Sequence, residues 1–273
     1  MIPAPPDGAT PARPDRPVVP APPPRRGPKG APAVTWRWPA VAAVWLLGNL
    51  VIGQIVAVGI VMAVLGFDDI EQLTEGSLGI TLSIMVDLIF VATMVVWLVR
   101  WHPGWVAALG LPRAGTWVKT VLAGAGWGVL LYPAIAIVVA LPLQALFSLV
   151  SDAPVNTPEQ VPSDLSAAGK LAAVVLAIVI APPVEELFYR GLLFRAIRDR
   201  RGFWAGASVS ALVFGVVHFV PAPWQETVLL QAIMVFTGFA LAWLYERSGT
   251  IVTTIVAHMV FNTIGITFIL SSG

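Results

Sequence analysis

Long apolar stretches recur along the chain from Pro39 to about residue 270, with shorter polar segments between them. Each stretch is close to the length of about 20 apolar residues that a transmembrane α-helix needs. Tryptophans such as Trp101 and Trp117 cluster at their ends, where amphipathic rings prefer to lie in a membrane. The stretches lie near residues 40–66, 80–99, 118–150, 169–195, 203–220, 227–245 and 250–270.

Two of these stretches contain internal prolines. The third is long and includes Pro133 and Pro142, which predict a kink or a partly interfacial segment. The fourth includes Pro182-Pro183, which could divide it into two helices. The pattern therefore predicts an all-α fold, a polytopic transmembrane helix bundle of seven or eight spans in a lipid bilayer.

The first 38 residues differ from the rest of the chain. They contain 12 of the 24 prolines, and their basic residues outnumber their acidic ones. A run such as Pro22-Pro23-Pro24 cannot form a helix, and the segment has too little apolar surface to offset the entropy of ordering. We therefore predict a disordered, basic, proline-rich tail over 1–38, N-terminal transmembrane helices over 39–168, and a chemically distinct region over 169–270.

The composition supports a membrane protein and excludes several other classes. Charged residues make up 11% of the chain and hydrophobic ones 57%, whereas soluble domains have about 25% and 45–50%. An ordinary cytosolic enzyme, a disordered regulator and a nucleic-acid-binding protein are excluded on this basis. The chain has no cysteine, which excludes disulfides, thiolate nucleophiles and zinc–cysteine sites.

The charges of the connecting segments alternate along the chain. The N-terminal tail and the segments 100–119 and 195–201 are basic, whereas 67–79 and 151–168 are acidic. The positive-inside rule then places the N terminus and the basic segments in the cytoplasm. The basic, Ala/Pro-rich composition is typical of a bacterial protein, so we expect the bacterial cytoplasmic membrane. The side of the C terminus depends on whether Pro182-Pro183 divides its stretch.

A few ionisable side chains fall inside apolar stretches, where each costs at least a few kcal/mol and is by default functional. They are Asp87, Glu185, Glu186, Arg190, His218 and His258. Glu185-Glu186 follows the double proline, so we expect both glutamates in the first turn of a helix. Glu186 and Arg190 are then i and i+4, in the favoured order for an ion pair, while Glu185 points about 100° away and can face a cavity.

Two further motifs carry the histidines. Phe214 precedes His218 by one helical turn, and His258 lies one turn before Asn262 on the same face of a helix. Each motif alone has an ordinary structural reading, as an interfacial histidine and as an interhelical hydrogen-bond pair. Likewise, an ion-pair lock would explain Glu186 and Arg190 but would leave Glu185 without a role.

Together these groups supply what hydrolysis of an amide within a membrane requires. Glu185 offers a base for water, and His218, His258 and Asn262 offer groups to hold that water and to stabilise an oxyanion. Glu185, His218 and His258 could alternatively hold a divalent metal such as zinc, with an open position for water. A metal would have to be gathered from three helices, because no H-E-x-x-H motif is present.

At these residues the sequence resembles the CAAX prenyl protease and bacteriocin-processing family of intramembrane proteases, known as CPBP or ABI. The family pattern is E-E-x-x-x-R, F-x-x-x-H and H-x-x-x-[NB] on successive helices. The order and spacing of Glu185-Glu186 with Arg190, Phe214 with His218, and His258 with Asn262 match it. Gly191 extends the first motif as in many members, and Tyr189 stands where phenylalanine is commoner. The match covers roughly 170–265.

The resemblance implies a helical bundle with a cavity open to the membrane or the cytosol, and it makes 169–270 a catalytic transmembrane domain. It implies that Glu185 activates water with help from His218, and that His258 and Asn262 stabilise the oxyanion. Glu186, Arg190 and Phe214 are supporting residues. Metal-dependent and metal-free glutamate schemes both use these residues, so the resemblance leaves the metal open.

The sequence thus predicts an intramembrane endopeptidase acting on a membrane-associated protein or peptide. The first alternative is a non-catalytic bacteriocin-immunity or membrane scaffold protein that keeps the motifs as a folding lock. The second is a small transporter with a proton relay, which is disfavoured because no internal repeat stands out.

Overall fold

The chain folds into a bundle of membrane-spanning helices. The computed structural model describes residues 27–65, 76–151, 154–158 and 165–272, and all regular secondary structure within these residues is helical. The predicted all-α fold is therefore confirmed. The six helices long and apolar enough to cross a membrane are Trp38–Val64, Leu78–Trp101, Trp117–Phe147, Ala167–Arg201, Trp224–Ser248 and Ile251–Ile269. A further apolar helix, α11 (Phe203–Val217), is shorter.

Three of the spans consist of consecutive helical elements that include π-helical stretches, named η2 to η5. The first span comprises α1 (Trp38–Trp45), η2 (Leu46–Gly53) and α2 (Gln54–Leu65). The third comprises α6 (Trp117–Ile135), η3 (Ala136–Ala140) and α7 (Leu141–Phe147). The fourth comprises α8 (Ala167–Val175), η4 (Leu176–Ile180), α9 (Ala181–Glu186), η5 (Leu187–Phe194) and α10 (Arg195–Arg201), and is called the α8–α10 helix below. The other helices are α4 (Gly76–Trp101), the short α5 (Trp105–Leu109), α12 (Trp224–Ser248) and α13 (Ile251–Ser272).

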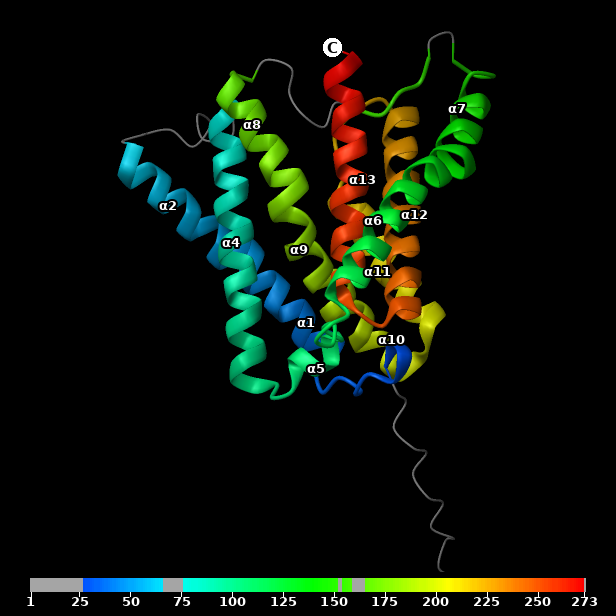
Figure 1. Cartoon of the computed structure of the whole chain (residues 1–273). Helices are drawn as coiled ribbons and strands as arrows, with labels where there is room; N and C mark the ends of the chain where they lie inside the picture. The colour runs from blue at the N-terminus through cyan, green and yellow to red at the C-terminus, as the bar shows by residue number, and fades with distance from the viewer. Residues whose placement is uncertain (1–26, 66–75, 152–153, 159–164, 273) are drawn as a thin grey trace, which may run out of the picture.

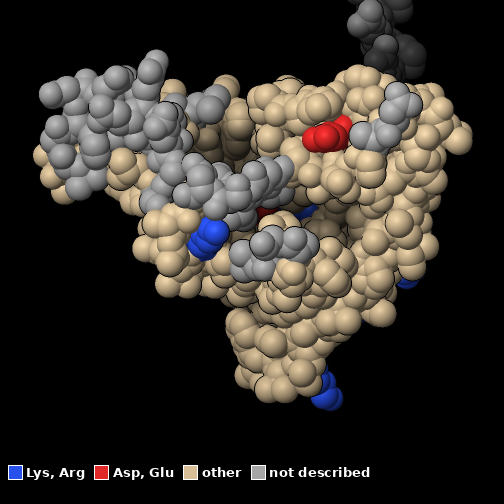
Figure 2. All heavy atoms as spheres, turned by 90° about the horizontal axis from the view of Figure 1, so that it is seen from above, with Lys and Arg blue, Asp and Glu red and all other residues tan. Residues whose placement is uncertain are grey.

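The helices alternate in direction, so the described N-terminal segment and the C terminus lie at opposite ends of the bundle (Figure 1). We call the end that carries the N-terminal segment the basic end, because it bears Arg100, Arg113, Lys119, Arg200 and Arg201. Figure 2 looks onto the opposite end, whose described surface shows few charged groups and is hollowed near its centre. The acidic residues of the two predicted acidic segments lie outside the described residues.

The double proline does not divide the fourth apolar stretch, because Ala167–Arg201 is one continuous helix. The sequence left open whether this stretch forms one helix or two, and in the structure it forms one. In η4 the N–H of Ala181 donates to the carbonyl of Leu176, five residues earlier, which is the π-helical register. Residue 182 would continue this register by donating to the carbonyl of Ala177, but proline has no N–H. The carbonyl of Ala177 consequently needs a donor from elsewhere.

The predicted boundary of the disordered tail at residue 38 is wrong, because residues 27–37 pack against the bundle. The side chain of Trp36 is only 2% exposed, and its indole Nε1 donates to the carbonyl of Leu192 at 3.1 Å. The backbone N–H of Val34 donates to Asp199 at 3.0 Å. Two buried apolar residues and these hydrogen bonds offset the ordering entropy that the prolines and charges led us to expect. Residues 1–26 of the predicted tail lie outside the described residues.

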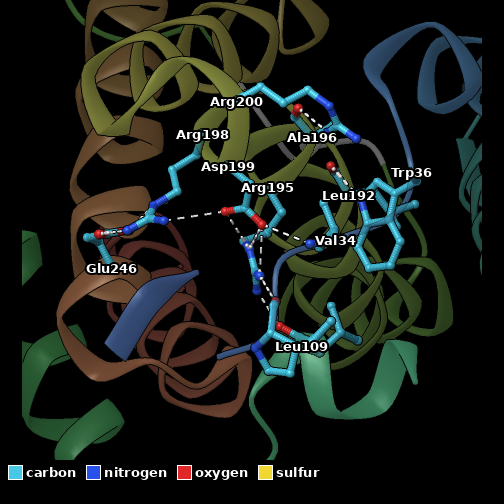
Figure 3. A network of polar contacts seen from close by, with 12 residues as sticks. Val34, Trp36, Leu109, Leu192, Arg195, Ala196, Arg198, Asp199, Arg200 and Glu246 are labelled. Carbon is cyan, nitrogen blue, oxygen red and sulfur yellow. Dashed lines mark hydrogen bonds and ion pairs between the residues drawn. The ribbon is translucent and has the colours of Figure 1, made fainter. Parts of the chain in front are cut away.

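A buried arginine joins this N-terminal segment to three other parts of the basic end (Figure 3). Arg195, which is fully buried, pairs with Asp199 at 3.0 Å and donates to the carbonyl of Pro32 at 2.6 Å. It also donates to the carbonyl of Ala108 and to the hydroxyl of Tyr245 on α12. Because five donors of a guanidinium can serve several acceptors at once, Arg195 fixes the end of the α8–α10 helix.

Helices α6 and α13 pack against each other unusually closely. A Cβ added at Gly124 would lie 2.7 Å from the carbonyl oxygen of Thr253, and one at Gly128 would lie 2.5 Å from that of Ala257. Only glycine at these two positions, one helical turn apart, permits this approach, which is the small-xxx-small packing of membrane helices. The two helices run in the same direction, so their N-terminal ends meet at the basic end.

Candidate active site

The glutamate pair lies in the middle of the α8–α10 helix, at the C-terminal end of α9. The expectation that it occupies a first helical turn is therefore wrong, and no free N–H groups of a helix terminus stabilise its charge. The stabilising partners come instead from the same helix and from α13.

Glu186 and Arg190 form the predicted i, i+4 ion pair. The guanidinium Nη1 lies 2.7 Å from the Oε1 of Glu186, and both side chains are fully buried. Arg190 also donates from Nη2 to the carbonyl of Gly238 on α12, at 3.1 Å, and its guanidinium carbon lies 4.8 Å from the centre of the Phe214 ring. Removing either partner would leave an uncompensated charge in an apolar interior.

Glu186 has a second partner that the sequence did not reveal. The Nδ1 of His258 lies 3.0 Å from the same Oε1 that receives Arg190. A carboxylate only accepts hydrogen bonds, so Nδ1 of His258 must carry the hydrogen. Glu186 thereby fixes the orientation of the imidazole, which is 3% exposed.

Glu185 lies between the two histidines of the motifs. Its Oε1 is 3.7 Å from the Nε2 of His218, and its Oε2 is 3.8 Å from the Nε2 of His258. Both distances exceed a direct hydrogen bond and are short enough for a single water molecule to contact both atoms. The structure thus brings Glu185, His218 and His258 together from three helices.

His218 ends α11 and is held by the residue one turn before it. Its Nδ1 lies 2.7 Å from the carbonyl oxygen of Phe214, and the two rings are 4.5 Å apart between centres. A carbonyl oxygen is an acceptor, so Nδ1 carries the hydrogen, and a neutral ring presents the lone pair of Nε2 toward Glu185. Phe214 is fully buried and also contacts His258, with 5.9 Å between ring centres.

Asn262 does not join the group around Glu185 by a described contact. Its Nδ2 donates to the carbonyl of Ala177 at 2.8 Å, which is the carbonyl that Pro182 leaves without a backbone donor. Because buried carbonyls are almost always paired, this bond secures α13 to the α8–α10 helix beside the double proline. The interhelical hydrogen-bond reading of this motif thus describes the amide of Asn262.

A cavity of about 410 Å³ opens beside Glu185 and His218. Asp87 on α4, predicted as a lower-ranked polar residue, lines this cavity together with Asn49 of η2. Sequence reasoning missed Asn49, although a carboxamide within an apolar stretch was the available signal. It also missed Ser210 of α11, whose hydroxyl donates to the carbonyl of Tyr189 at 2.9 Å. A small hydroxyl residue on an apolar helix gives no distinctive signal.

The predicted metal ligands do not form a ready coordination sphere. Within the described ranges, no three His, Asp or Glu side chains are grouped closely enough to hold a metal ion. Donor atoms that share a tetrahedral zinc with bonds of about 2.0–2.1 Å lie roughly 3.3 Å apart. The separations of 3.7 and 3.8 Å from Glu185 to the two Nε2 atoms are wider than this. The residues as they lie do not fit a bound zinc ion.

Comparisons with known proteins agree with the motifs. Residues 167–264 match the family model described as "Type II CAAX prenyl endopeptidase Rce1-like". "Putative membrane peptidase YdiL" of Bacillus subtilis (strain 168) is 30% identical over 90 residues, which cover 33% of this chain and 34% of that protein. An "Uncharacterized 24.3 kDa protein" of Escherichia coli is 25% identical over 108 residues, covering 39% of this chain and 48% of that protein. No solved structure matches the chain.

The fold and these comparisons define an integral membrane protein with a polar site between its C-terminal helices. The family model that residues 167–264 match agrees with the CAAX prenyl protease and bacteriocin-processing family that the three motifs indicated. The matched regions span about a third and about half of the lengths of the two curated relatives.

Proposed function

We propose that the protein is a membrane-embedded endopeptidase of the CAAX-protease type, which hydrolyses a peptide bond in a membrane-associated protein or peptide. The observation that carries this proposal is the position of Glu185, 3.7 Å from the Nε2 of His218 and beside a cavity. The family of the matched region supports the same class of reaction.

In the proposed reaction, a water molecule lies between Glu185 and His218. The carboxylate of Glu185 accepts one of its hydrogens, and the Nε2 lone pair of His218 accepts the other, because the opposite ring nitrogen is committed to Phe214. With both hydrogens held by acceptors, an oxygen lone pair of the water is free to attack the carbonyl carbon of the peptide bond. Glu185 then takes up one proton as the new C–O bond forms.

The negative charge that develops on the carbonyl oxygen needs a donor. We propose that the Nε2–H of His258 supplies one, because Glu186 accepts the hydrogen bond from Nδ1 and so directs Nε2 toward the reacting group. Asn262 retains a second N–H beside the one given to Ala177, and we propose this N–H as a further oxyanion donor. When the C–N bond breaks, Glu185 returns its proton to the leaving nitrogen, so the carboxylate is regenerated.

We infer the orientation of the protein in the bilayer from its basic connecting segments. We place the basic end on the cytoplasmic side, in the cytoplasmic membrane of a bacterium, because short basic segments remain on that side. The C terminus then lies on the opposite side, since an undivided fourth stretch makes the number of crossings odd if α11 also crosses.

Cleavage by the purified full-length protein in lipid vesicles tests the proposal. The probes are a farnesylated CAAX peptide and an unmodified membrane-anchored peptide, with products identified by mass spectrometry. We expect a defined product from at least one probe, which Glu185→Gln and His218→Ala each abolish. Persistence of the product in both variants would refute the catalytic assignment.

The same assay addresses the metal and the non-catalytic alternative. Loss of cleavage on chelation, restored by a divalent metal, would replace the metal-free scheme by one in which Glu185, His218 and His258 gather around an ion. A scaffold or immunity protein would keep its biological function in Glu185→Gln, because shape and hydrogen bonding are nearly preserved. The buried Arg190–Glu186–His258 contacts are consistent with such a lock, but they give Glu185 no role.

A further inference from the structure

A second cavity, of about 330 Å³, lies at the basic end between α6, α12 and α13. Three cationic side chains line it: Lys29 from the N-terminal segment, Lys119 from α6 and Arg247 from α12. Its described lining contains no carboxylate, and within the described residues none of these three cations has an ion-pair partner. Glu246 is not part of this lining: it pairs with Arg198, and it lines an adjoining cavity that Lys29 and Arg247 also border. The cavity therefore combines unneutralised positive charge from three separate parts of the chain.

Two helix N-termini open onto the same cavity. Thr116 and Thr120 place the start of α6 in its wall, and Thr250 and Thr253 do so for the start of α13. The hydroxyl of Thr116 donates backward to the carbonyl of Arg113, so the first turn of α6 has no side-chain cap. Unpaired N–H groups and the positive end of the helix dipole favour an anion at such a position.

The close packing of α6 and α13 brings these two N-termini together. Gly124 and Gly128 let the helices approach while both run in the same direction, so their positive ends add instead of cancelling. In an antiparallel pair, each N-terminus would face the negative end of its neighbour. The positive ends of the two parallel helices and the three cations thus all favour an anion in the same cavity.

The surroundings of the cavity indicate which kind of molecule carries the anion. Ala123 and Trp127 of the α6 span form one side of it, and Trp127 is 41% exposed. The ring of Trp127 meets that of Trp243 edge to face, with 5.4 Å between centres. Tryptophans with apolar neighbours mark the level of lipid headgroups, so the cavity is polar toward the basic end and apolar toward the bilayer.

We propose that this cavity binds the phosphate of an anionic phospholipid headgroup. Lys119, Arg247 and Lys29 surround the phosphate with charge, while the hydroxyl of Thr250 and the unpaired first N–H groups of α6 supply hydrogen bonds. The acyl chains leave along the apolar surface beside Trp127. The bound lipid joins the N-terminal segment, α6, α12 and α13, and the site is separate from the cavity beside Glu185.

The test uses the full chain in detergent, titrated with phosphatidylglycerol or phosphatidylcholine, with bound lipid counted by native mass spectrometry. We expect tighter binding of phosphatidylglycerol, and a loss of at least about tenfold in its affinity for the double variant Lys119→Gln/Arg247→Gln. The matched control is Arg100→Gln/Arg201→Gln, which removes the same charge from exposed positions of the basic end outside the cavity. The control affinity is expected to stay within about twofold.

Three results would overturn the proposal. Equal losses in the two double variants would show that binding follows the general charge of the basic end. Equal affinities for the two lipids would show that no anion is recognised. Displacement of phosphatidylglycerol by an equimolar concentration of inorganic phosphate would identify a free anion, and not a lipid, as the occupant.

Discussion

The C-terminal helices and α4 are held in place by different kinds of contact. In the C-terminal helices, buried polar bonds join neighbours directly: Arg190 to Gly238, Glu186 to His258, and Asn262 to Ala177. In α4, by contrast, the hydroxyls of Ser83 and Thr93 bond to carbonyls of their own helix. The inner face of α4 packs through apolar residues, including Phe90, Met94 and Leu98.

Because of this difference, the positions of the site residues and the shape of the cavity beside them depend on different kinds of contact. A hydrogen bond in an apolar medium is directional and costly to leave unmade, so it fixes the position of a side chain. Apolar contacts tolerate replacement of similar volume. The C-terminal helices therefore fix Glu185 and the histidines, while α1, η2 and α4 supply an adaptable cavity wall. The predictions below test this division.

The largest effect is expected at Glu185. Glu185→Gln removes the group that accepts a proton from water, so the cleavage rate should fall by about 10²–10⁴-fold, the range typical of a general base. The midpoint of thermal unfolding should stay unchanged. Glu226→Gln, in the first turn of α12 and outside the cavity lining, is the control and should cleave normally. Substantial activity in Glu185→Gln would contradict the assignment of catalysis to the residues that the C-terminal helices hold in place.

The second effect concerns stability. Arg190→Met leaves the buried carboxylate of Glu186 without its 2.7 Å partner and should lower the free energy of unfolding by about 3–5 kcal/mol. The double variant Glu186→Gln/Arg190→Met removes both charges and should recover part of that loss. Unfolding in lipid-containing detergent measures both. A double variant less stable than Arg190→Met would show that the pair is not a coupled unit.

A smaller, diagnostic effect is expected at Asn262. Asn262→Leu leaves the Ala177 carbonyl unpaired and should cost about 1–3 kcal/mol of stability. Pro182→Ala restores a backbone N–H that can reach this carbonyl, so the cost of Asn262→Leu should shrink in that background. A double-mutant cycle on unfolding free energies measures this coupling. Strict additivity would show that Pro182 does not create the need for the amide.

The smallest effect is expected in the adaptable wall. Asp87 lines the cavity with Glu185 but has no described bond to it, so Asp87→Asn should change kcat/KM by less than about tenfold. Cleavage of both peptide probes gives the measurement, and the ratio between the probes should change more than the stability. Complete loss of activity would place Asp87 among the residues that perform the reaction.

Much of this arrangement could be predicted from local patterns. Span length indicated the helices, and the i, i+4 spacing gave the Glu186–Arg190 pair, because both depend only on sequence-local geometry. The bond from Asn262 to Ala177 could not be predicted, since it depends on a π-helical register that keeps the helix continuous through Pro182. The burial of Trp36 was missed because average composition over 38 residues hides two apolar anchors. The orientation of His258 by Glu186 requires knowing how α13 meets the α8–α10 helix.

The ion pair within one helix has a consequence for how the protein enters the membrane. Glu186 and Arg190 lie one helical turn apart on the same face, so they can neutralise each other as soon as that helix forms. This pairing lowers the insertion penalty of about 2.5–3.5 kcal/mol that each charge at the centre of a membrane helix carries. His258 and Asn262, by contrast, arrive with α13, the last described helix to be synthesised. During biogenesis the Glu186–Arg190 pair can thus be neutral before α13 is present, and the group around Glu185 is assembled only after α13 has been synthesised.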